Sequence, residues 1–364
     1  MNKRIGFVVF LLIELGLLIS CGQRSGSGDL FSEESFNTRI ELRDGRQVVV
    51  DDLLLGQPTL IRFHPDSFLV IEEFGTPRLI KILDLKTHKV REMIPRGRGP
   101  GEMLVSWGVE IIDRDIFLFC GQLRKIIILS PSDDRNFTID NEFYIEEKQT
   151  QRIHPLSRDM YVCLSSIGDE MRFTLLDGKG KIIKKFGEYP PFINDDEIKA
   201  DNDIFFSSIG STPDGKRFAA VCSKTDLFEL YDIEKGLLKR FQGPLGLKIS
   251  VEAQLVGTGF MLKPQPHYTT YHHVIADKDE FWTAYIGYHF QKGKNQTLEE
   301  QCAKKLFCFD WQGTPLRMVI LEYPAISFDI DWRNEVLYTL ELQDSDALIC
   351  EYSLNWSTQG VRNK

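Results

Sequence analysis

The chain has 364 residues, 42% of them hydrophobic, and its 44 basic and 53 acidic residues give a net charge of −9. This length can bury a large core, but it exceeds a usual single domain unless the fold is built from repeats. The acidic balance, without a basic patch, argues against binding nucleic acid, and seven cysteines without a CxxC pair argue against a zinc site.

The N-terminus predicts export. Lys3 and Arg4 precede an apolar run over residues 5–19, which is too short for a comfortable membrane span and suits a signal peptide. The run ends in Leu-Ile-Ser-Cys at residues 18–21, which resembles the lipobox of bacterial lipoproteins, although Glu14 departs from an apolar segment. We therefore predict a signal peptide over residues 1–20, a lipid on Cys21 and a flexible tether over residues 21–35. The alternative is an ordinary signal peptide with an incidental cysteine.

A short motif recurs along the rest of the chain: a turn with an acidic or amide residue, followed by an apolar strand. Its six copies lie at residues 64–70, 113–118, 157–162, 212–219, 277–282 and 332–338. Each copy is followed by an apolar strand, a turn and another strand, which is a hairpin signal. Each unit therefore predicts a four-stranded blade. Because such a blade cannot bury both of its faces alone, we expect an all-β, six-bladed propeller.

The sixth unit lacks a convincing outer strand. The segment 36–42 has a β-like pattern and is otherwise unassigned, so we predict that it completes the sixth blade and closes the ring. The propeller then spans residues 36–364. Two long units are explained by inserts, a loop or helical turn over residues 194–203 and a short helix within residues 295–305.

The order of lipobox, Pro-Asp-type turns and Arg-Gly-Arg-Gly-Pro-Gly-Glu at residues 96–102 resembles the TolB-like six-bladed β-propeller lipoproteins. The resemblance covers nearly the whole mature chain. It implies a propeller anchored to the bacterial outer membrane, on its periplasmic or its external face. It implies no reaction.

The glycine-rich segment also supplies our candidate ligand site. Its spacing is wrong for a dinucleotide loop, and the next blade follows instead of a helix. We expect Arg96 and Arg98 to lie at one mouth of the central channel, where they would bind an anionic or sugar-acid ligand with Glu102, stacked on Trp107 and joined by His154. The alternative is a structural crossing in which these charges pair with one another or with neighbouring loops.

Four histidines, at positions 267, 272, 273 and 289, lie among aromatic residues. Adjacent strand residues face opposite sides, and no carboxylate stands at ligand spacing, so we predict no metal. The aromatic residues suit a blade core, or else a stacking surface for sugar or peptide. The sequence contains no Gly-x-Ser-x-Gly elbow and no P-loop, and we assign no catalytic residue and no cofactor.

We therefore predict a non-enzymatic binding platform on the cell envelope, for a ligand (glycan or anionic) or a protein partner. One alternative is an exported carbohydrate-active hydrolase or lyase with its site at the central channel, and another is a structural subunit of an envelope complex. The channel mouth discriminates between them: convergent His, Arg and carboxylate groups favour an enzyme, whereas an apolar rim favours a partner.

Overall fold

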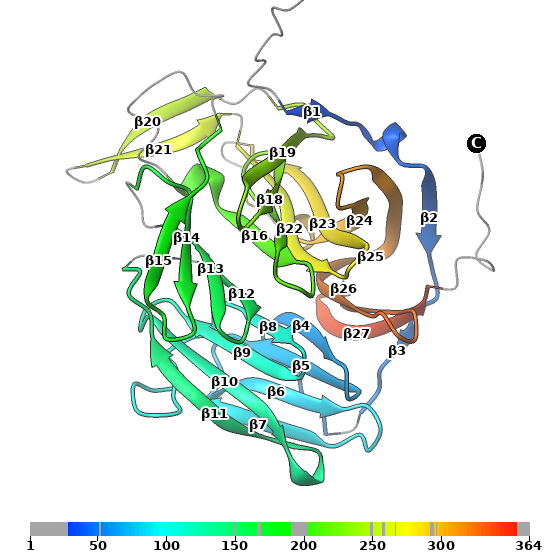
Figure 1. Cartoon of the computed structure of the whole chain (residues 1–364). Helices are drawn as coiled ribbons and strands as arrows, with labels where there is room; N and C mark the ends of the chain where they lie inside the picture. The colour runs from blue at the N-terminus through cyan, green and yellow to red at the C-terminus, as the bar shows by residue number, and fades with distance from the viewer. Residues whose placement is uncertain are drawn as a thin grey trace, which may run out of the picture.

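The computed structural model describes residues 28–50, 52–148, 150, 152–165, 169–190, 202–247, 250–256, 259–265, 267–291, 295 and 297–354. The predicted signal peptide, Cys21 and most of the predicted insert at 194–203 lie outside these residues. The described chain is built from strands (Figure 1). Its helical elements are short 3-10 turns: η1 (Glu33–Ser35), η2 (Asp133–Arg135), η4 (Asn202–Phe205) and η5 (Glu299–Gln301).

Four blades are separate antiparallel sheets. The first comprises β4 (Pro58–His64), β5 (Phe68–Glu73), β6 (Arg78–Asp84) and β7 (Val90–Pro95). The second comprises β8 (Val109–Ile112), β9 (Asp115–Cys120), β10 (Lys125–Ser132) and β11 (Asn136–Tyr144). The third comprises β12 (Ile153–Ser157), β13 (Met160–Leu164), β14 (Phe173–Asp177) and β15 (Ile182–Phe186). The fourth comprises β16 (Ser207–Ser211), β17 (Arg217–Cys222), β18 (Leu227–Asp232) and β19 (Gly236–Gln242).

The fifth and sixth blades share one long strand, β25 (Pro315–Asp331). Its residues 315–320 form the outer strand of the fifth blade, after β22 (Tyr268–Ala276), β23 (Glu280–His289) and β24 (Ala303–Asp310). Its residues 325–331 form the innermost strand of the sixth blade, before β26 (Val336–Gln343) and β27 (Asp346–Ser353). The predicted six-bladed, all-β propeller is therefore confirmed.

The innermost strands β4, β8, β12, β16, β22 and the second half of β25 neighbour one another around the ring. We call the side on which they begin the base face and the side on which they end the mouth face. All six copies of the predicted turn motif connect an innermost strand to the second strand of its blade, so all six lie on the mouth face. Six buried apolar clusters fill the six joints between neighbouring blades.

An N-terminal arm closes the ring, but not with the predicted residues. β3 (Arg46–Gln47) pairs with β27 and supplies the fourth strand of the sixth blade. β2 (Thr38–Leu42) instead lies parallel to β25 at residues 317–321, on the outer edge of the fifth blade. The assignment of residues 36–42 to the sixth blade was therefore wrong. Ile40 and Leu42 are buried in the cluster between the fifth and sixth blades, which fixes β2 there.

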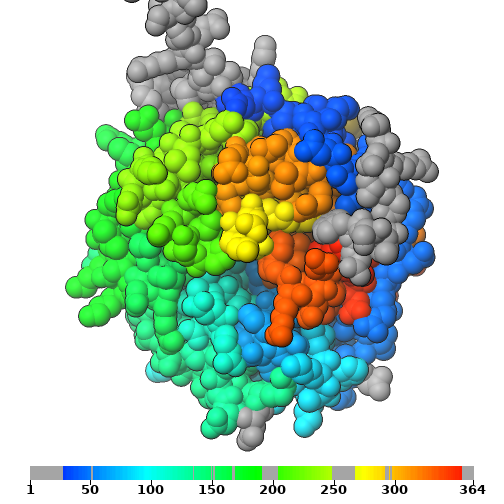
Figure 2. Space-filling view, turned by 45° about the vertical axis from the view of Figure 1, so that its right-hand side comes forward, coloured from blue at the N-terminus to red at the C-terminus, as the bar shows by residue number. Residues whose placement is uncertain are grey.

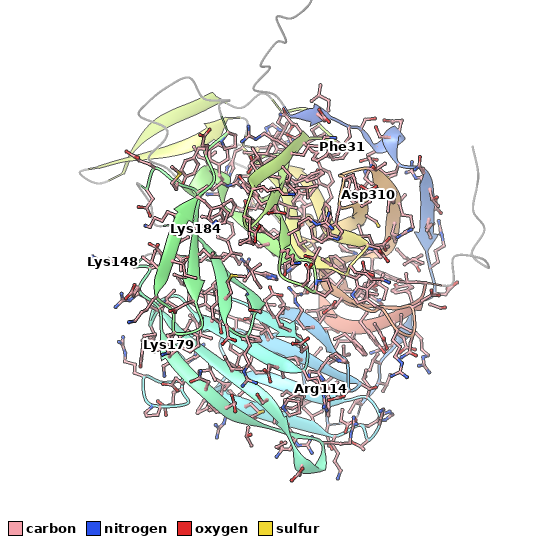
Figure 3. The ribbon with its side chains drawn as sticks, in the orientation of Figure 1. Phe31, Arg114, Lys148, Lys179, Lys184 and Asp310 are labelled. Atoms are coloured by element: carbon pink, nitrogen blue, oxygen red, sulfur yellow. The ribbon has the colours of Figure 1, made fainter. Side chains whose placement is uncertain are left out.

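The arm also begins earlier than predicted. β1 (Asp29–Leu30) runs parallel to the end of β19, and Asp29 pairs with Lys239 at 2.8 Å. Phe31, which is labelled in Figure 3, lies beside the fourth and fifth blades and packs edge-on against Phe228 and Phe309. The predicted tether over residues 21–35 thus includes ordered residues from Asp29 onward. In Figure 2 this blue arm runs along the outer edge of the orange and red segments.

Two connections differ from a plain propeller. The predicted short helix within residues 295–305 is present as the single turn η5. Between β19 and β22, β20 (Ser250–Val256) and β21 (Gly259–Gln265) form a separate two-stranded sheet outside the ring of blades (Figure 1). This hairpin is absent from the sequence predictions above.

A buried ionic group links the third and fourth blades. Glu229 on β18 accepts hydrogen bonds from Arg172, from Arg240 at 2.6 Å and from the Tyr231 hydroxyl at 3.0 Å. Arg172 also donates to Ser207 Oγ at 2.7 Å. The side chains of Arg172 and Glu229 are 1% and 0% exposed, so removing one partner leaves an uncompensated charge in the joint.

We expect Glu229→Ala to lower the free energy of unfolding by about 3–5 kcal/mol, because Arg172 would stay buried without its counter-charge. Urea titration followed by tryptophan fluorescence measures this loss. The matched control is Glu41→Ala, which breaks the exposed pair with Arg43 and should cost less than about 1 kcal/mol. Equal losses in both variants would contradict a structural role for the buried group.

Candidate functional site

The mouth face holds a cavity of about 700 Å³ at the axis of the ring. Every blade contributes to its wall through the innermost strand, and four blades also through the turn that follows. One residue from each blade, in ring order, is Arg62, Glu110, His154, Ser211, Val274 and Asp329. We call this space the mouth cavity. Its volume lies in the range of small-molecule sites.

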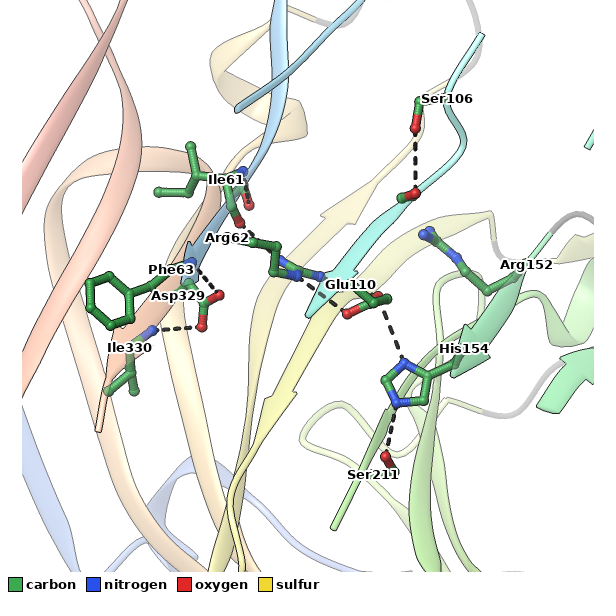
Figure 4. Close-up of polar contacts among 12 residues, drawn as sticks. Ile61, Arg62, Phe63, Ser106, Glu110, Arg152, His154, Ser211, Asp329 and Ile330 are labelled. Atoms are coloured by element: carbon green, nitrogen blue, oxygen red, sulfur yellow. Dashed lines mark hydrogen bonds and ion pairs between the residues drawn. The ribbon is translucent and has the colours of Figure 1, made fainter. Parts of the chain in front are cut away.

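Four polar side chains from consecutive blades form a chain across the mouth cavity (Figure 4). Arg62 Nε lies 3.3 Å from Glu110 Oε2, and Arg62 Nη2 lies 3.5 Å from Glu110 Oε1. His154 Nδ1 lies 3.8 Å from Glu110 Oε1, while His154 Nε2 is 3.0 Å from Ser211 Oγ. Burial opposes ionisation of Glu110, but Arg62 and His154 outweigh it and lower the pKa of Glu110 to about 2. Glu110 is therefore a carboxylate at neutral pH.

Asp329 is a second carboxyl group on the cavity wall, with a different environment. Its Oδ2 accepts the backbone N–H of Phe63 at 2.9 Å, and its Oδ1 accepts that of Ile330 at 2.7 Å. Burial raises the pKa of Asp329 to about 6, against the lowering effect of Arg62 and of these two hydrogen bonds. The cavity therefore combines a firmly ionised carboxylate with one that titrates close to neutral pH.

Further polar groups line the channel towards the base face. Arg152 Nη1 donates to the carbonyl of Trp107 at 3.3 Å. Burial, together with the charges of Arg152 and Arg62, lowers the pKa of His272 to about 4, so this imidazole is neutral at pH 7. In the part of the chain that the structure describes, no three His, Cys, Asp or Glu side chains gather as metal ligands. The six cysteines of that part are free and buried.

Comparison of the sequence with known protein families agrees with this architecture. The TolB-like six-blade propeller family matches residues 38–354. The chain belongs to this family. No curated protein matches it in sequence. Within the described residues, no helix is long and apolar enough to cross a bilayer.

Solved structures resemble this TolB-like propeller in fold. A member of the DUF4221 family from Bacteroides vulgatus is 11% identical with a TM-score of 0.58, over 87% of this chain and 98% of that one. A protein of Bacteroides fragilis described as exported is 12% identical with a TM-score of 0.50, over 92% and 99%. At these identities the likeness concerns the fold, so the site has to be argued from its own geometry.

The glycine-rich loop of this TolB-like propeller lies away from the axis. Gly99 N–H donates to Glu102 Oε2 at 2.8 Å, and Lys125 Nζ donates to the carbonyls of Gly99 and Glu102 at 2.9 and 3.1 Å. Gly101 N–H donates to Glu142 on β11 at 2.6 Å. The loop thus rests on β10 and β11, the two outer strands of the second blade.

The expected position of Arg96 and Arg98 at a channel mouth was therefore wrong. Both are exposed on the base face, and neither is among the described residues that line the mouth cavity. The reason is that the connection from β7 to β8 stays at the outer strands until it approaches Trp107. The backbone N–H of Trp107 donates to the carbonyl of Phe119 at 2.8 Å, and its ring packs over Gly121. Ligand binding by Arg96, Arg98, Glu102 and Trp107 stays a prediction.

Of the sequence-predicted site residues, the structure brings His154 into the mouth cavity. Sequence reasoning missed Arg62, Glu110, Ser211 and Asp329. A usable signal was present, because Arg62, Glu110 and Asp329 are each a charged residue within a short apolar strand just before a repeated turn. A charge at such a position is costly unless it is paired, which indicates convergence on a shared site.

The raised pKa of Asp329 predicts a pH-dependent stability. The folded state binds this proton more tightly than the unfolded chain, so wild type should gain stability relative to Asp329→Asn as the pH falls from 7 to 4. A pKa of about 6 against an ordinary 3.8 corresponds to about 3 kcal/mol. Denaturant unfolding at several pH values measures the difference. The low pKa of Glu110 acts in the opposite sense, with stability lost as the pH falls from 4.5 towards 2, so it overlaps this window only at its acidic end. A difference that does not change between pH 7 and 4 would contradict the elevated pKa of Asp329.

Proposed function

We propose that this TolB-like propeller is a cell-envelope lipoprotein that binds a small polar ligand in the mouth cavity. The observation that carries the proposal is the convergence of Arg62, Glu110, His154 and Asp329, from four separate blades, on one concave space. Charged side chains on innermost strands are expensive to bury. Their gathering at one point is better explained by recognition than by stability, since apolar residues would pack the axis more cheaply.

The lining suits a ligand that carries several hydroxyl groups or a carboxyl group. Carboxylates accept hydrogen bonds from hydroxyls, the guanidinium of Arg62 donates, and His154 and Ser211 can do both. Trp332 and Phe63 add partly buried aromatic surface to the wall. This combination of apolar surface with a few convergent polar groups is typical of small-molecule sites, and a glycan or sugar acid meets both requirements.

A second candidate function is that of an exported carbohydrate-active hydrolase or lyase. Two observations favour it. His154, Arg62 and two carboxyl groups converge at the channel mouth, which is the arrangement expected of an enzyme. In addition, Glu110 has a pKa of about 2 and Asp329 a pKa of about 6. Two carboxyl groups whose environments separate their pKa values are the usual acid and base of glycoside cleavage. Release of reducing ends from acidic polysaccharides, abolished by both Glu110→Gln and Asp329→Asn, would favour this function over binding alone.

The binding proposal predicts that His154→Gln weakens ligand affinity about tenfold, the cost of about 1.4 kcal/mol for one lost hydrogen bond to a charged or polar ligand. Calorimetry with uronic acids, dicarboxylates and neutral disaccharides measures it. Arg98→Ala is the matched control, because it removes a cation from the exposed glycine-rich loop and should leave affinity unchanged. The reverse result, loss in Arg98→Ala alone, would move the site to that loop.

The lipid anchor makes a separate prediction. Replacing Cys21 with Ala should remove fatty-acid labelling and shift the exported protein from the membrane fraction to the soluble fraction, because no other acyl attachment point is predicted. Radiolabelled palmitate and membrane fractionation provide the two readouts. If the Cys21→Ala protein still carries fatty acid, the anchor has been assigned to the wrong residue.

A further inference from the structure

The two faces of the propeller differ in the kind of side chain they expose. The mouth face carries the repeated aspartate turns, such as those at Asp66, Asp214 and Asp277. On the base face, the connections between strands and the strand residues that reach this face carry most of the large hydrophobic side chains that the fold leaves exposed. These are Leu30, Val49, Leu54, Phe74, Tyr144, Met171, Leu245, Leu298 and Tyr323. Scattered exposed hydrophobics are ordinary, but their concentration on one face marks an interaction surface.

Part of this apolar surface surrounds a second cavity, of about 930 Å³, on the base face between the fifth, sixth and first blades. Val49, Leu54, Phe74 and Leu298 all line it and are all more than half exposed. The segment that carries Leu54 is held in place, since Gly56 N–H donates to Glu73 at 2.7 Å and Lys81 donates to the Leu54 carbonyl. The exposure of Leu54 therefore belongs to an ordered segment whose neighbours Leu53 and Leu55 pack inward.

The N-terminal arm enters the fold on the same face. β1 pairs with the last two residues of β19, where the outer strand of the fourth blade reaches the base face. Residues 22–28 connect this point to Cys21, and seven extended residues span at most about 25 Å. A lipid on Cys21 therefore holds the bilayer within that distance of the base face.

The hairpin β20–β21 leaves the ring from the same end of β19. Its register sets Val251, Ala253 and Leu255 opposite Pro264, Leu262 and Phe260, so the positions of one face of this small sheet are all apolar. The alternate positions include the pair Glu252 and Lys263. An isolated two-stranded sheet is marginal in water.

We propose that the base face rests on the lipid bilayer that holds the Cys21 anchor, with Leu54 and Phe74 in contact with lipid. This orientation rests on the proposed lipid anchor. It directs the mouth cavity away from the membrane, towards the aqueous phase from which a polar ligand arrives. Amphipathic surfaces bind the interface in this way through buried apolar area, strengthened when a covalent lipid supplies a second attachment.

The buried cysteines allow a direct test. The six cysteines of the described chain are at most 8% exposed, and burial raises the pKa of Cys302 to about 11, so a thiol probe reacts selectively with a cysteine introduced at the surface. Leu54→Cys and Phe74→Cys place an environment-sensitive bimane on the base face. Ile183→Cys is the matched control, because Ile183 on the outer strand β15 is 55% exposed against 54% for Phe74. Lys216→Cys reports the mouth face.

The lipidated proteins are reconstituted into vesicles of phosphatidylethanolamine and phosphatidylglycerol, with and without a spin-labelled lipid. Probes at positions 54 and 74 should shift to the blue and lose most of their emission to the spin label, whereas probes at 183 and 216 should not change. Unchanged emission at 54 and 74, or equal shifts at all four positions, would overturn the proposal. Unchanged emission at positions 54 and 74 would favour a protein partner as the occupant of the apolar face.

Failure of the anchor is distinguishable from failure of this orientation. Fatty-acid labelling of the same samples reports the anchor alone, so a lipidated protein without a probe shift refutes the orientation and leaves the anchor intact. If labelling fails, the same four probes are read on Cys21→Ala protein with excess vesicles. The same order of shifts is then expected at higher lipid concentration, and its absence again refutes the orientation.

Discussion

Each blade of this propeller has two apolar faces, and the neighbouring blades on either side are what cover them. This constraint explains why six core clusters occur at six joints, and why the joint between the last and the first blade has to be as well made as the others. That joint contains Ile61, Leu69, Tyr338 and Leu340. It is reinforced where Ser327 Oγ and Asp329 accept the backbone N–H groups of Ile61 and Phe63 at 3.2 and 2.9 Å. Asp329 thus belongs both to the closure of the ring and to the mouth cavity.

The ring also explains how a polar site arises from residues far apart in the chain. Each innermost strand lines the axis, so a single charge placed on it meets its counterparts from the other blades. Arg62 and Glu110 are 48 residues apart, and His154 and Ser211 are 57 apart, yet they form one chain of contacts. The mouth face is polar because short turns follow the ends of the innermost strands. Most connections on the base face are longer and have room for apolar residues.

The sequence was informative wherever the determining interaction is local. The six turns with an acidic or amide residue specify their own backbone, so the number of blades could be predicted. The strand that pairs with residues 36–42 could not be predicted. The alternation of Ile40 and Leu42 indicates that one face of this strand is buried. It does not indicate whether the strand pairs with the outer edge of the fifth blade or of the sixth. The glycine-rich loop misled for a related reason, since its motif describes a tight turn and does not report its distance from the axis. Arg62 and Glu110 were overlooked because each looks like an isolated charge until the ring places them together.

The N-terminal arm has a consequence for the order of folding. Arg46 bonds to Glu351, which is 305 residues later, and Asp44 N–H donates to Glu322, which is 278 residues later. The first ordered residues of the chain are thus among the last to find their partners, and until then the outer edges of the fourth, fifth and sixth blades are bare. Contacts of such long sequence separation form slowly, and unpaired strand edges invite aggregation meanwhile. A chain built in this way is most exposed to aggregation after its sixth blade has formed and before the arm has paired with the three outer edges.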